Sequence, residues 1–83
     1  MAEREVGKVT HYFGHLGVAG IKLTAPLSVG DQIHIFGHTS DMTINVDSIQ
    51  IQHEQVLKAD AGAEIGLKVP DHVREHDTVF KVE

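Results

Sequence analysis

Histidine is the residue type in this sequence with the clearest chemical potential, with seven copies among 83 residues and no cysteine. Six of them form pairs spaced by four residues: His11/His15, His34/His38 and His72/His76. On a helix this spacing would place two imidazole rings on one face, as many zinc sites do. On a strand, four residues span about 13 Å, which is too far for two rings to bind one metal ion. A metal site would therefore need rings from different strands.

Solvated polar surface is the simplest interpretation of these histidines, and we predict no metal site and no cofactor. Two alternatives stay open: a histidine-based metal-binding protein, and association that depends on pH, because an unperturbed histidine titrates near about pH 6.5. No serine or threonine lies in a motif typical of a nucleophile, and the carboxylates are scattered along the chain. We therefore expect no catalytic residues and a protein that is not an enzyme.

The charge balance argues against stand-alone binding to nucleic acid. Seven lysines and arginines stand against twelve acidic residues, giving a net charge of −5 at pH 7. Phosphate binding needs clustered cations, because counterion release supplies most of the affinity. No Gly-x-x-x-x-Gly-Lys-Ser/Thr loop is present, so GTP binding is not expected. With a charged start and no long apolar run, we expect a cytoplasmic protein without membrane contact.

Short segments of alternating polarity, separated by glycine-rich turns, must position these side chains. Six such segments predict strands: Val6–Phe13, Val18–Leu23, Gln32–Phe36, Met42–Gln52, Ala63–Val69 and Thr78–Val82. This spacing predicts an all-β fold, a closed six- or seven-stranded antiparallel β-barrel. Residues 1–83 are expected to form a single domain, with residues 1–5 as a flexible N-terminus. Ten apolar side chains are predicted to be buried: Val9, Ile21, Leu27, Ile33, Ile35, Val46, Ile49, Ile65, Leu67 and Val79.

The fourth segment contains an error of phase. Its first two core candidates, Ile44 and Val46, are out of register by one residue with Ile49 and Ile51. A β-bulge near residues 47 and 48 would place all four on the core face. A helix over residues 47–59 is the competing interpretation, although it lacks a clear 3.6-residue period.

Two glycines are expected to have structural roles. Gly30 precedes an aspartate in a predicted turn, where a positive φ is needed. Gly7 lies inside a strand pattern, which indicates a close backbone approach or a bend.

The order of these motifs resembles domain 2 of elongation factor Tu and related translation GTPases. The resemblance is carried by residues Val6–Val9, Leu27–Gly37, Val46–Gln50, Ala61–Leu67 and Asp77–Phe80. It implies the translation-protein type of β-barrel. In those factors domain 2 helps to hold the aminoacylated end of tRNA, but the matched motifs are structural and carry no contact residues across.

The hairpin segment Thr10–Ile21 departs from the factors and resembles the C-terminal barrel of collagenase-like peptidases, a family with RNA-modifying relatives. Two functions follow as expectations. The first is a non-enzymatic binding module, like domain 2 of elongation factors, that docks on a protein or ribonucleoprotein. The alternative is an accessory subunit of a collagenase-like peptidase or RNA-modifying enzyme.

A partner surface is predicted from rings that the core does not explain. If they share one face, they form an aromatic patch with few formal charges, which is typical of an interface. The predicted partner-binding residues are His11, Tyr12, Phe13, His15, His34, Phe36 and His38.

Overall fold

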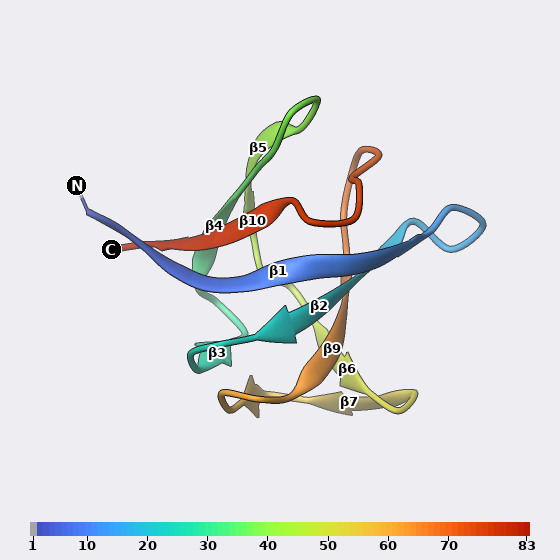
Figure 1. Cartoon of the computed structure of the whole chain (residues 1–83). Helices are drawn as coiled ribbons and strands as arrows, with labels where there is room; N and C mark the ends of the chain where they lie inside the picture. Colours follow the sequence, from blue (N-terminus) through green and yellow to red (C-terminus); the bar gives the residue numbers. More distant parts are fainter. Residues whose placement is uncertain (1) are drawn as a thin grey trace.

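The computed structural model describes residues 2–83 and contains ten β-strands (Figure 1). They are β1 (Glu3–Phe13), β2 (Val18–Leu23), β3 (Leu27–Ser28), β4 (Gln32–Phe36), β5 (Asp41–Asn45), β6 (Ile49–Ile51), β7 (Glu54–Val56), β8 (Lys58–Ala59), β9 (Glu64–Lys68) and β10 (Thr78–Val82). No helix long and apolar enough to cross a membrane occurs among residues 2–83.

Eight strands form one antiparallel sheet in the order β5-β4-β10-β1-β2-β9-β6-β7, and β3 pairs with β8 in a second, two-stranded sheet. The predicted all-β antiparallel class is confirmed. The predicted count of six or seven strands was too low for two reasons: residues 27–28, 54–56 and 58–59 form strands too short to show an alternating pattern, and the single strand predicted for residues 42–52 forms two, β5 and β6. Between residues 2 and 83 no strand ladder joins β5 to β7, so the pairing does not close the sheet into a barrel.

The phase error at residues 44–51 marks a change of partner rather than a bulge. Strand β5 pairs only with β4 at one edge of the sheet, whereas β6 pairs with β7 and β9 near the other edge. The intervening residues 46–48 carry the chain across. Val46 and Ile49 are buried, but Ile44 and Ile51 are only half-buried. The helix considered for residues 47–59 does not form, because β6, β7 and β8 occupy that segment.

The core contains all ten of the apolar side chains predicted to be buried, each at 3% exposure or less. Alternation explains this result, because every second side chain of a strand points to the same face. On β4, for example, Ile33 and Ile35 are fully buried while Gln32 and Phe36 are exposed.

Strand β1 lies at the middle of the sheet, and its glycine allows close packing. A Cβ atom on Gly7 would stand 2.6 Å from the carbonyl oxygen of Lys22 on β2, which confirms the predicted close approach. Gly30 has a φ of 98°, as the turn prediction required. Within residues 1–5, whose flexibility stays a prediction, Glu3 and Glu5 lie in β1 and pair with Val82 and Phe80 of β10. Met1 of that segment lies outside the described residues.

Candidate functional site

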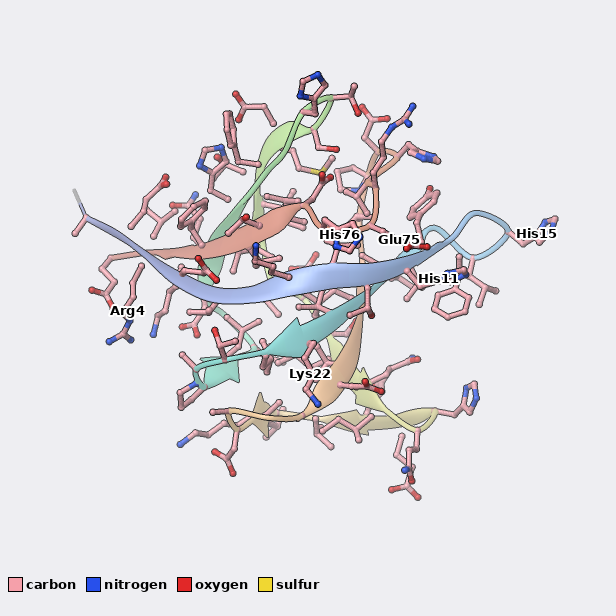
Figure 2. All side chains as sticks on the ribbon, viewed as in Figure 1. Arg4, His11, His15, Lys22, Glu75 and His76 are labelled. Atoms are coloured by element: carbon pink, nitrogen blue, oxygen red, sulfur yellow. The ribbon has the colours of Figure 1, made fainter. Side chains whose placement is uncertain are left out.

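The predicted partner-binding residues lie on two separate hairpins. Strand β1 ends with His11, Tyr12 and Phe13, and His15 lies in the turn to β2; Figure 2 labels His11 and His15. His34 and Phe36 lie on β4, and His38 follows in the turn to β5. Figure 1 shows that these hairpins project in different directions. Among residues 2–83, ring contacts link His11 to Phe13 and His34 to Phe36, but no ring contact links the two hairpins. The rings therefore form two groups, so the condition for a single patch, that all of them share one face, is not met.

Tyr12 and Phe13 point to opposite sides of β1, as expected for neighbours in a strand. The Tyr12 ring packs against the core and lies 4.5 Å, centroid to centroid, from the ring of His72. The Phe13 ring is 46% exposed and meets His11 edge-on at 4.4 Å. Phe13 and His11, but not Tyr12, are therefore available on the outer face of the sheet.

An apolar groove lies on this outer face, across β1, β2, β9 and β6, with a volume of about 280 Å³. Phe13 and Leu16 line it at the hairpin end, and both are exposed, Leu16 at 68%. Gln50, His53 and Glu64 contribute to its lining from β6, the turn after β6, and β9. The groove thus combines uncovered apolar side chains with polar groups.

Two glycines opposite each other form the floor of this groove. Gly20 of β2 pairs with Gly66 of β9, and Gly66 also pairs with Gln50 of β6. A Cβ atom on Gly20 would meet the Phe13 ring at 3.6 Å, and one on Gly66 would meet Val18 at 3.2 Å. Because both positions lack side chains, the backbone of the sheet is uncovered between the neighbouring residues.

The turn between β6 and β7 lines one side of the groove, and its backbone has an unfavourable conformation. Gln52 and His53 have φ values of 50° and 69°, in the left-handed region that residues with a Cβ adopt at a cost. Two consecutive residues with positive φ are typical of the two-residue type I′ hairpin turn, in which Asn-Gly is the preferred sequence.

His34 on the other hairpin is held by two carboxylates. Its Nδ1 atom lies 3.0 Å from Glu3 Oε2, and its Nε2 atom lies 2.6 Å from Asp41 Oδ1. The hydrogen bond with Glu3, followed by that with Asp41, raises the pKa of His34 above its ordinary value, although partial burial opposes the shift. The carboxylates sit at opposite ring nitrogens and so do not converge on one ion. Among residues 2–83, no group of three or more His, Asp or Glu side chains is arranged to hold a metal.

The fold of this small all-β domain has counterparts among solved structures. The crystal structure of the C-terminal domain of a Geobacillus thermoleovorans "putative U32 peptidase" superposes with a TM-score of 0.89, covering 96% of this chain and 93% of that domain at 18% identity. Its selenomethionine variant superposes with a TM-score of 0.87 over 92% of this chain and 96% of that chain, also at 18% identity. At this identity the likeness concerns the fold.

Sequence similarity points to the same class of protein. The chain is 38% identical over 77 residues to an uncharacterized protease of Methanocaldococcus jannaschii, covering 92% of this chain and 19% of the protease. It is 36% identical over 78 residues to a collagenase of Porphyromonas gingivalis, covering 92% of this chain and 22% of the collagenase. The chain thus spans about a fifth of the length of the curated relatives that it matches. No protein-family model matches it.

The assignment to domain 2 of elongation factor Tu is therefore wrong, and so is the translation-type function inferred from it. Nearly the whole chain aligns with collagenase-like proteases, and its fold matches the C-terminal domain of a peptidase. The alternative, a relationship to collagenase-like peptidases, is better supported. The misleading motifs, such as Leu27–Gly37, consist of a turn and an alternating strand, which many unrelated β domains share.

Several residues of the groove and of the His34 site were not predicted from the sequence. The floor glycines Gly20 and Gly66 looked like ordinary strand glycines, because only the strand register places them opposite each other. Leu16, between Gly14 and Gly17, could have been noticed as an apolar residue in a turn. The Glu3 partner of His34 lies 31 residues away in sequence and carries no local signal.

Proposed function

We propose that this chain acts as the accessory β domain of a collagenase-like protease system, and that it contributes a contact surface while catalysis takes place elsewhere. The alignment carries this proposal: 92% of the chain matches a segment amounting to 19–22% of two proteins named as a protease and a collagenase. In those proteins, most of the chain lies outside the matched segment. The outer groove supports a contact role, because exposed apolar surface is the common mark of an interaction site.

We also infer that the curved sheet forms a nearly closed barrel. One backbone bond supports closure: Val29 N donates to Leu57 O at 2.9 Å and so joins the segment before β4 to the segment after β7. The β3–β8 pair adds to this support, because it ties the segment before β4 to the segment after β7. Slow hydrogen exchange at the Val29 amide, comparable to that of β1, would agree with closure.

A domain exchange tests the proposed function. The segment of the Porphyromonas gingivalis collagenase that aligns with this chain would be deleted, or replaced by this chain or by an unrelated β domain of similar size. We expect deletion to lower collagen cleavage and this chain to restore it at least in part. The unrelated domain should not restore it, and the isolated chain should cleave no collagen. The proposal would be contradicted if the collagenase carrying this chain were no more active than the deleted collagenase, or if the isolated chain cleaved collagen.

A further inference from the structure

Lysines border the apolar groove on the outer face of the sheet. Lys8 of β1 lies directly opposite Lys22 of β2, and Lys22 lies opposite Glu64 of β9. Antiparallel partners project to the same side, and Lys22 shares its side of β2 with Gly20 in the groove floor. In Figure 2 the ammonium end of Lys22 lies near β9. On the other side of the glycine pair, Lys68 lies opposite Val18.

These three lysines are unpaired within the described chain. The ion pairs among residues 2–83 involve other groups, and none of them includes Lys8, Lys22 or Lys68. Like charges directly opposite each other in a sheet are destabilising, so the Lys8–Lys22 pair reduces stability, and the opposite charge of Glu64 on the other side of Lys22 offsets part of that loss. The protein has only seven lysines and arginines and a net charge of −5, yet three of these cations lie two residues along a strand from a groove-lining residue: Lys8 from Thr10, Lys22 from Gly20 and Lys68 from Gly66. Glu64 is the one carboxylate among the described groove-lining residues.

We propose that this groove binds an extended segment of a partner protein in which an apolar side chain is flanked by carboxylates. This inference rests on the proposed function, since it names the chemistry of the partner that the accessory domain contacts. The apolar side chain lies over Gly20 and Gly66 and packs against Phe13 and Leu16. The carboxylates face Lys8 and Lys22 on one side of the groove and Lys68 on the other.

The composition of the groove favours a protein segment over a single-stranded nucleic acid. Base binding depends on aromatic platforms for successive bases along a cationic track. Here the rings are those of Phe13, His11 and His53. The His11 ring already packs edge-on against Phe13, and Leu16 adds an aliphatic side chain with no ring to stack on a base. The volume of about 280 Å³ is at or below the lower end of small-molecule pockets, which suits an inserted side chain.

A titration of the full chain with short synthetic peptides tests this inference. The probe peptide carries one central phenylalanine with glutamates on both sides, and two control peptides carry glutamine for glutamate or alanine for phenylalanine. We expect the probe to shift the amide signals of Gly20 and Gly66, and both control peptides to bind about tenfold or more weakly. Because exposed charges are screened by salt, binding should also weaken as ionic strength rises.

Matched variants separate the groove from the rest of the surface. Lys22→Glu and Phe13→Ala should weaken peptide binding about tenfold, while Lys58→Glu and Leu57→Ala, which change an exposed lysine and an 80% exposed leucine outside the groove, should not. The inference is overturned if the glutamine peptide binds as well as the probe, if the amides of Gly20 and Gly66 do not respond at millimolar probe, or if a single-stranded oligonucleotide binds there instead. Restored collagenase activity together with any of these results would leave the proposed function standing.

Discussion

The carboxylate of Asp77 occupies the space in which a side chain on Gly37 would stand. Asp77 is 4% exposed, and its Oδ2 atom accepts a hydrogen bond of 3.0 Å from the backbone nitrogen of Arg74. Its Oδ1 atom overlaps the position of a Cβ atom built on Gly37. The turn before β10 and the end of β4 thus fit together only because residue 37 has no side chain.

Gly37→Ala should therefore destabilise the protein by about 2–4 kcal/mol, since the methyl group would displace Asp77 and strain its hydrogen bond. Chemical denaturation would measure the loss. Gly14→Ala is the matched control, because its Cβ would meet Tyr12 at an ordinary 3.7 Å. Equal effects of the two substitutions would contradict this explanation.

The stability contributed by His34 should depend on pH. Hydrogen bonds with Glu3 and Asp41 raise its pKa in the folded state, so protonation favours folding. This contribution is complete below the unfolded-state pKa of about 6.5 and is lost as the pH rises through the raised folded-state pKa. Denaturation at several pH values, compared with His34→Gln, would reveal it. An NMR titration that places the His34 pKa at or below its ordinary value would contradict the geometry.

The turn at residues 52 and 53 should be easy to stabilise. Gln52→Asn with His53→Gly supplies the residues that this turn prefers, and we expect the unfolding free energy to rise by about 1 kcal/mol. His53→Ala keeps a Cβ in the left-handed conformation and should give no such gain. A double variant no more stable than this control would show that the turn is not strained.

Ile35→Ala should cost about 2–5 kcal/mol, the usual range for truncating a fully buried aliphatic side chain. Its neighbour Phe36 is 50% exposed, so Phe36→Ala should cost much less. Thermal or chemical unfolding of both variants measures the difference. A loss at Ile35 no larger than that at Phe36 would place Ile35 outside the core.

GTP should not change the melting temperature of this protein, even in large excess, because a ligand stabilises the folded state only if it binds. A melting scan with and without sub-millimolar GTP tests this expectation. A clear upward shift would show that the chain binds the nucleotide without a recognised phosphate loop.

The core could be predicted from the sequence because it depends on local alternation. Ile33 and Ile35 are separated by one residue, and this spacing alone places both on the buried face of a strand. The sites could not be predicted in the same way, because each depends on register between distant strands. Gly20 meets Gly66, and His34 meets Glu3, only after the whole sheet has formed.

The short strands, and the choice between the two resemblances, could not be predicted from the sequence for a related reason. Residues 27–28 and 58–59 form β3 and β8 through pairing with each other, not through any alternating pattern of their own. The turn and strand at Leu27–Gly37 form a structural motif that occurs in β domains of different function, so this motif does not identify a family.

The pairing of β1 with β10 has a mechanical consequence. The ladder begins with the bond from Glu83 N to Ala2 O and continues from Glu3–Val82 to Lys8–Thr78, so both strand ends lie at one end of the ladder (Figure 1). Tension that pulls these ends apart would act along the direction of the hydrogen bonds and break them one after another. Strands β1 and β10 should thus separate one hydrogen bond after another under a low force, although neither is an edge strand of the sheet.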